Sequence, residues 1–197
     1  MKILKKAFKF MLVFTVICGL IYPVFIAGIS QALFRDKVNG SIIKINGKSY
    51  GSTLLAQEFT GNEYMWGRVM NLDTTTYKNK DGEILMYSTP SNLSPASDEY
   101  ERLIKERVDK IKESNPDKKD EAIPVDLVTS SGSGLDPHIS IKASEYQVDR
   151  IAKSRNISNE EVENIIRKYT KGRTFGIFGE ERVNVLEVNL ALDGILK

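Results

Sequence analysis

The hydrophobic residues of this chain form one long N-terminal run and, after it, short spaced groups. Residues 10–34, FMLVFTVICGLIYPVFIAGISQALF, contain no charged side chain. A run of about 25 residues is long enough to cross a hydrocarbon layer of about 30 Å as a helix. We therefore expect one transmembrane helix. Pro23 should kink this helix without ending it, because a neighbouring helix can satisfy the carbonyl that proline leaves free.

A cleaved signal peptide is the alternative interpretation of this segment. Signal peptides have an apolar region of about 7–15 residues, which is shorter than this run, although residues 30–32, Ser-Gln-Ala, resemble a cleavage site. Four lysines precede the run, and only Arg35 and Lys37 follow it closely. Positive charges favour the cytoplasmic side of a membrane. We therefore expect residues 1–35 to form a cytoplasmic N-terminus and the transmembrane helix, and residues 36–197 to form an extracytoplasmic domain.

The later hydrophobic groups alternate between strand-like and helix-like spacing, which predicts one domain of mixed α/β fold. Asn46-Gly47 lies between two short β-prone runs and predicts a hairpin. Residues 71–97 are rich in Asn, Thr, Ser and Pro and lack periodicity, so we expect a long excursion with a functional role. Strands are also expected over residues 123–129 and 173–179, and residues 183–196 fit either a strand or a terminal helix.

Capping signals predict three helices in this domain. Asp98 begins the first, which Asn115-Pro116 should end. Ser140 begins the second, which should reach about residue 154. Ser158 begins the third with Glu161 in a capping box, and Gly172 suits its end.

The composition excludes several classes of function. The net charge is +2, and no basic face is interleaved with aromatic residues, so a nucleic-acid partner is not expected. The single cysteine, Cys18, lies in the apolar run, which excludes a disulfide framework and a cysteine-ligated zinc site. His138 is the only histidine, so no site with two histidine ligands can form, and we expect no bound metal.

The densest cluster of candidate chemistry is the segment of residues 128–140, VTSSGSGLDPHIS. Between a strand and a helix, a glycine-rich segment can present backbone N–H groups to an anion. No known motif fits, however. A P-loop needs a lysine directly after Gly134, a dinucleotide fingerprint needs glycine in place of Pro137, and a nucleophile elbow needs glycine in place of Ser131.

Three interpretations of this segment therefore remain open. In the first, Asp136-Pro137 shapes a turn and His138 hydrogen-bonds across it. In the second the segment binds an anion, and in the third His138 is a catalytic base with Asp136 as the only nearby acid. An exposed face of the segment could also contact a partner. The residues of this candidate structural or partner loop are Ser131, Gly132, Gly134, Asp136, Pro137 and His138.

Three stretches carry a resemblance to a known family: IPVDLVTSSGSGLDPHIS at 123–140, ASEYQVDRIAKSR at 143–155 and GRTFGIFGEERVNVLEVNLALD at 172–193. With them, the chain resembles the C subunit of the Kdp potassium-transporting ATPase over essentially its whole length. It departs from the family pattern after Arg68, where many members carry Pro-Ser.

The resemblance implies a non-catalytic accessory subunit of an ATP-driven, high-affinity potassium importer in the bacterial cell membrane. Its implied partners are a channel-like potassium-binding subunit, a P-type ATPase subunit and a small single-span subunit. The implied roles are assembly of the complex and a "catalytic chaperone" effect that raises the ATPase subunit's affinity for ATP. Gln147 is the implied nucleotide contact, with ATP as the ligand.

The expected topology conflicts with a direct contact between Gln147 and ATP, because Gln147 would lie outside the cell and ATP inside it. A glutamine also offers only neutral hydrogen bonds, which suit polyphosphate poorly. We therefore expect the domain to dock on the extracellular face of the channel-like subunit. Two alternatives are a membrane-anchored hydrolase that uses His138 and Asp136, and a free-standing nucleotide-binding module that uses Gln147.

Overall fold

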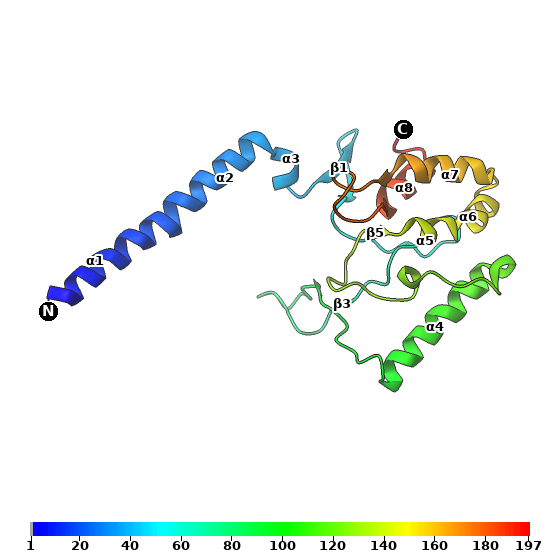
Figure 1. The fold of residues 1–197 in the computed structure, drawn as a ribbon, viewed down its shortest axis with the longest axis horizontal. Helices are drawn as coiled ribbons and strands as arrows, with labels where there is room; N and C mark the ends of the chain where they lie inside the picture. Colours follow the sequence, from blue (N-terminus) through cyan, green and yellow to red (C-terminus); the bar gives the residue numbers. More distant parts are fainter. Residues whose placement is uncertain (1) are drawn as a thin grey trace. The chain divides into compact units, whose positions relative to one another are not determined.

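A computed structural model describes residues 2–197, which divide into two compact units on either side of the bond between Ile42 and Ile43. The N-terminal unit is helical (Figure 1). Its helix from Lys2 to Leu33 is long and apolar enough to cross a membrane, and all of its residues except Ser30 are exposed. The elements of this unit are α1 (Lys2–Val16), the π-helical turn η1 (Ile17–Ile21), α2 (Tyr22–Leu33) and the short α3 (Arg35–Val38).

The long helix continues through Pro23, as predicted. Proline has no N–H to donate, and its ring crowds the carbonyl four residues earlier. Directly before Pro23 the helix widens into the η1 turn, where the N–H of Tyr22 donates to the carbonyl of Ile17, five residues back. Wide turns of this kind accommodate such a disturbance without ending a helix. The division of the chain at residue 35 into membrane and extracytoplasmic parts stays a prediction.

The hairpin predicted at Asn46-Gly47 starts at Ile42, the last residue of the N-terminal unit, and continues into the C-terminal unit. It consists of β1 (Ile42–Ile45) and β2 (Lys48–Ser52). Asn46 has φ 51° and Gly47 φ 78°, so both turn residues lie in the left-handed region that a type I′ turn requires. The hairpin is confirmed because asparagine and glycine are the residues that tolerate this backbone.

The excursion of residues 71–97 is ordered around a second short hairpin. Its strands are β3 (Leu72–Asp73) and β4 (Tyr87–Ser88), which pair antiparallel. The carboxylate of Asp73 accepts hydrogen bonds from the side chain and backbone of Thr76 and from the backbone of Thr75, and these bonds lower the pKa of Asp73. The side chain therefore fixes the turn that leaves β3.

The helices of this unit agree with most of the capping signals. Ser140 and Ser158 are N-caps, as predicted, and accept hydrogen bonds from the N–H groups of the residues three positions later. The first helix is capped by Ser97, one residue before the predicted Asp98. The predicted second helix is interrupted near Gln147. The helices are α4 (Asp98–Ser114), α5 (Ile141–Glu145), α6 (Val148–Arg155), α7 (Asn159–Lys168) and α8 (Val185–Leu192).

Three predicted elements are wrong. Residues 123–129 contain a 3₁₀ turn, η3 (Val125–Leu127), and directly after it the hydroxyl and N–H of Thr129 bond to the carbonyl of Val125. Residues 174–179 form a tight turn, because Gly176 and Gly179 take positive φ. The third helix ends at Lys168, four residues before Gly172. A further 3₁₀ turn, η2 (Pro116–Lys118), follows α4.

A three-stranded antiparallel sheet organises the C-terminal half of the unit, with the order β5-β7-β6. The strands are β5 (His138–Ile139), β6 (Thr170–Lys171) and β7 (Arg182–Asn184). Residues 182–192 thus form a strand followed directly by α8, so the two alternatives for this segment are both realised. The core packs β7, α5, α6, α7 and α8 together (Figure 1) and includes Ile139, Ile151, Val162, Val183 and Val188. The mixed helix and sheet fold is confirmed.

Candidate functional site

The segment of residues 128–140, here called the junction loop, is bonded to backbone from several distant parts of the C-terminal unit. Three of its carbonyls accept hydrogen bonds from backbone N–H groups of other segments; they belong to residues 134, 135 and 137. Its residue Ser140 donates its own N–H to the carboxylate of Asp126 at 2.7 Å. The three backbone bonds are Asn71 to Gly134, Ala56 to Leu135 and Val185 to Pro137, each 3.0 Å long. The loop therefore holds the unit's irregular segments together.

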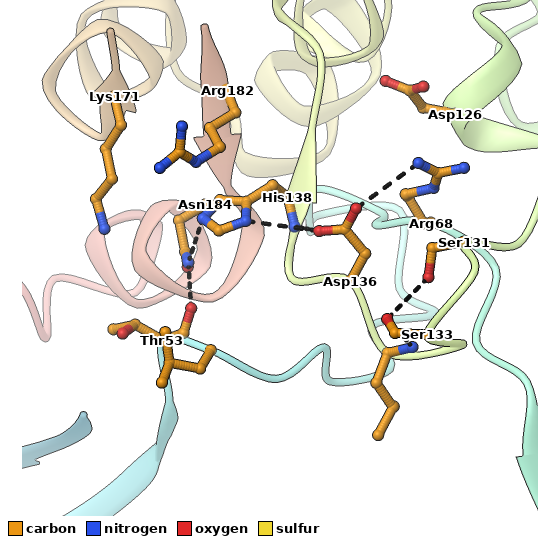
Figure 2. Close-up of polar contacts among 12 residues, drawn as sticks. Thr53, Arg68, Asp126, Ser131, Ser133, Asp136, His138, Lys171, Arg182 and Asn184 are labelled. Carbon is orange, nitrogen blue, oxygen red and sulfur yellow. Dashed lines mark hydrogen bonds and ion pairs between the residues drawn. The ribbon is translucent and has the colours of Figure 1, made fainter. Parts of the chain in front are cut away.

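Asp136 and His138 form a local turn inside this loop (Figure 2). One carboxylate oxygen of Asp136 accepts the backbone N–H of His138 at 3.0 Å and lies 3.5 Å from the ring Nδ1. The other oxygen lies 3.7 Å from the guanidinium of Arg68. The bond from His138, together with the charge of Arg68, lowers the pKa of Asp136. Asp136 is thus an ionised group that shapes the loop.

The opposite side of the His138 ring faces Asn184 of β7 (Figure 2), with 3.5 Å between Nε2 and the amide nitrogen. Asn184 is fully buried and donates to the carbonyl of Thr53 at 2.9 Å. Its side-chain oxygen accepts the N–H of Glu187 and so caps α8. The two ring nitrogens of His138 therefore face Asp136, which shapes the loop, and Asn184, which caps α8.

The serines of the loop engage its own amides. Ser131 Oγ accepts the N–H of Gly134 at 3.0 Å and lies 3.2 Å from Ser133 Oγ, which accepts the N–H of Leu135 at 3.2 Å. Amides bonded in this way are not free to bind an anion. The arrangement favours the turn over the phosphate cradle among the three interpretations left open by the sequence.

Gly134 provides a direct test of the loop's structural role. It has φ 72°, and a Cβ at this position would lie 2.6 Å from the carbonyl oxygen of Thr89 and 2.7 Å from that of Asn71. We expect Gly134→Ala to lower the free energy of unfolding by about 2–4 kcal/mol, measured by chemical denaturation of the full chain in detergent.

Gly132→Ala is the matched control for this substitution. Gly132 is exposed, its φ is not in the left-handed region, and nothing lies within 4 Å of its added Cβ. Its substitution should change the unfolding free energy by less than about 0.5 kcal/mol. Equal effects at the two glycines would contradict the contacts described here.

Gln147 lies outside the junction loop, between α5 and α6, and is 1% exposed. Its side-chain oxygen accepts the backbone N–H of Trp66 at 2.8 Å and a guanidinium N–H of Arg150 at 2.6 Å. Its amide nitrogen donates to the carbonyls of Trp66 and Ala143, both at 3.0 Å. A glutamine amide offers two donors and two acceptor positions, and all four are used inside the protein.

Asn189 of α8 bonds the backbone of Met65 in the way that Gln147 bonds the backbone of Trp66, the next residue. Its side-chain oxygen accepts the N–H of Met65 at 2.8 Å, and its amide nitrogen donates to the Met65 carbonyl at 2.9 Å. Met65 and Asn189 are both fully buried. Gln147 and Asn189, here called the amide clamp, thus bond the backbone of two consecutive residues as a neighbouring β-strand would.

Two arginines extend the clamp along residues 62–66. Arg150 donates to the carbonyls of Asn62 and Tyr64, and its guanidinium carbon lies 4.3 Å from the centroid of the Trp66 ring. Burial lowers the pKa of Arg150 to about 10, so this side chain stays protonated at neutral pH. Arg155 donates to the carbonyl of Glu63 and pairs with Asp193 at 2.7 Å.

The surroundings of Gln147 do not fit a nucleotide ligand. The side chain is buried, and each of its hydrogen-bonding positions has a partner within the domain. A nucleotide could reach it only if the backbone of Trp66 moved away. Within the described part of the chain, no group of His, Cys, Asp and Glu side chains is arranged to hold a metal ion.

Gln147→Ala should therefore act on stability. The substitution leaves the Trp66 N–H and one guanidinium N–H of Arg150 without acceptors, and each unpaired buried group costs about 1–3 kcal/mol. We expect the unfolding free energy of the full chain to fall by about 2–4 kcal/mol. Unfolding can be monitored by the fluorescence of Trp66, the only tryptophan in the sequence.

Asn189→Ala should destabilise the chain to a similar extent, because it releases the same segment. Glu145→Ala, at an exposed position of α5, should have an effect below about 0.5 kcal/mol. A Gln147→Ala chain that is as stable as the Glu145→Ala chain would refute the structural role of Gln147.

Sequence reasoning missed Asn189, Arg150 and Trp66. A usable signal exists for Asn189, which stands inside the apolar stretch VLEVNLAL where solvent exposure is not expected. Arg150 lies three residues after Gln147, so the two side chains share a helix face. Nothing in the sequence, however, indicates that their common partner is backbone near residue 65.

Comparison with known proteins agrees with the resemblance found in the sequence. Residues 4–194 match the sequence model of the family KdpC, described as the K+-transporting ATPase, c chain. The chain belongs to the KdpC family. A "Potassium-transporting ATPase KdpC subunit" of Clostridium perfringens is 61% identical over 197 residues, which is all of both chains.

More distant KdpC relatives match almost as completely. The subunit of Paraburkholderia phytofirmans is 45% identical over 181 residues, or 92% of this chain and 91% of the relative. The subunit of Methylococcus capsulatus is 44% identical over 191 residues, or 97% of each chain. The junction loop and the amide clamp thus belong to a subunit of a K+-transporting ATPase that carries one candidate membrane-spanning helix.

Proposed function

We propose that this chain is an accessory subunit that assembles and stabilises a high-affinity potassium importer. In this proposal the N-terminal helix anchors it in the cell membrane, with the lysine-rich N-terminus in the cytoplasm. The domain after the helix docks on the extracellular face of the channel-like potassium-binding subunit. The P-type ATPase subunit and the small single-span subunit complete the complex.

Membership of the KdpC family is the observation that carries this proposal. The state of the polar groups in the domain supports it. The serines of the junction loop bond to the loop's own amides, and His138 lies between Asp136 and Asn184. A domain arranged in this way is suited to docking rather than to catalysis. We therefore do not propose a hydrolase that uses His138 and Asp136.

We further propose that any effect on the ATPase subunit's affinity for ATP is indirect. Gln147 is enclosed within the domain and fully hydrogen-bonded, so it is poorly placed to touch a nucleotide. Docking can still change a distant affinity if it favours one conformation of the partner subunits. The chain would then act by stabilising the conformation of the complex that binds ATP tightly.

Site-specific crosslinking in membranes that contain the whole complex tests the docking step. Ser133 is at the exposed tip of the junction loop, and Lys112 is exposed on α4. We expect a photocrosslinker at residue 133 to capture the channel-like subunit. The same group at residue 112 serves as the control for non-specific capture. Capture of the cytoplasmic domains of the ATPase subunit from residue 133 would overturn both the topology and the docking surface.

A further inference from the structure

The turn of residues 174–179, TFGIFG, presents three large apolar side chains to solvent between β6 and β7. Phe175 is 88% exposed, Ile177 71% and Phe178 66%. Phe175 and Ile177 are the most exposed large hydrophobic residues of the C-terminal unit. This segment is here called the apolar turn. Exposed apolar residues that are grouped in this way mark a contact with a protein or a membrane.

The apolar turn is held in a defined shape. Thr174 and Phe178 exchange backbone hydrogen bonds of 2.8 and 3.0 Å, and Arg173 and Glu180 form an ion pair of 2.7 Å at its base. Phe175 has φ 55°, a left-handed backbone that is uncommon for a bulky side chain and costs stability. A costly conformation that exposes a phenylalanine points to a function for this turn.

The backbone of the apolar turn is suited to a medium without water. The N–H groups of Thr174, Gly176, Ile177 and Phe178 all donate to carbonyls within the segment of residues 173–178. A backbone N–H without a hydrogen-bond partner costs several kcal/mol in hydrocarbon, because no water is present there to accept the bond. The turn could therefore enter the edge of a bilayer without leaving these donors unpaired.

The length of the connection to the candidate membrane span favours a bilayer as the occupant. The span ends at Leu33 and the C-terminal unit begins at Ile43, ten residues later. Ten residues reach at most about 35 Å, so the domain stays close to the membrane surface. Three side chains cover only a small part of the roughly 800 Å² that each partner contributes to a typical protein interface. A bilayer requires no complementary pocket, and aromatic residues are enriched at its interface.

We propose that the apolar turn inserts into the lipid leaflet on the domain's own side of the membrane and acts as a second membrane contact. Phe175, Ile177 and Phe178 are the inserting side chains. With the transmembrane helix as the first contact, the turn limits the orientations of the domain relative to the bilayer. This inference rests on membrane anchoring by the N-terminal helix and not on docking to another subunit.

Depth-dependent quenching of a fluorophore tests the insertion. Cys18 is the only cysteine, so Cys18→Ser with Ile177→Cys gives the full chain a single attachment point for an environment-sensitive dye. In nanodiscs without other subunits, we expect loss of emission when the lipid tails are brominated near the headgroups. We also expect a blue shift relative to the same dye at position 112. The dye at position 112, on α4, should keep its emission.

Two further measurements complete the test. Adding Phe175→Ser and Phe178→Ser should abolish the quenching at position 177 while the unfolding transition stays unchanged, because the three side chains are exposed. If the dye at position 177 is not quenched by brominated lipid in the chain alone, the proposal is overturned. Protection of the dye only after assembly with the other subunits would identify a protein contact and would also overturn it. The crosslink from residue 133 reports docking separately.

Discussion

The structure depends on the hydrogen bonds that the amide clamp makes to the backbone of residues 65 and 66. Met65 is fully buried, yet none of the strands in residues 2–197 lies beside it to accept its N–H and donate to its carbonyl. Buried backbone groups need partners, and here two side-chain amides take the place of a strand. The partners are far apart in the sequence, since Asn189 is 124 residues from Met65 and Gln147 is 81 residues from Trp66. The clamp therefore connects α5, α6 and α8 to the long irregular segment that precedes them.

The junction loop also provides hydrogen-bond partners for irregular segments, through its own backbone and short side chains. Most of the C-terminal unit before α4 has little regular structure, so its segments need fixed points elsewhere. The loop provides them through the carbonyls of Gly134, Leu135 and Pro137, while Asp136 holds the turn next to His138. The groups that resembled catalytic or phosphate-binding chemistry in the sequence are thus engaged in supporting the fold. This arrangement agrees with an accessory subunit that presents a shaped surface to its partners.

Local signals in the sequence predict a turn or a helix start correctly where a single side chain determines the backbone conformation. The turn at Asn46-Gly47 needs residues that tolerate positive φ, and Ser140 and Ser158 satisfy helix N–H groups directly. The strand expected at residues 123–129 is wrong because the N–H groups of Leu127 and Val128 close a 3₁₀ turn, and the hydroxyl of Thr129 bonds back to the carbonyl of Val125. Apolar spacing does not reveal such local competition for backbone groups. The partners of Gln147 could not be predicted, because they are backbone groups brought close only by the tertiary fold. The strand expected at residues 173–179 was also wrong, because Gly176 and Gly179 take positive φ and the chain turns there.

Native-state hydrogen exchange of the full chain tests the role of the clamp most directly. The amides of Met65 and Trp66 lie outside helices and strands. Amides in such irregular segments commonly exchange through local fluctuations. Because each donates to a side chain of the clamp, the account predicts that both exchange only upon global unfolding, as slowly as the amides at the centre of α6. Exchange of either amide at the rate of an unstructured peptide would contradict it.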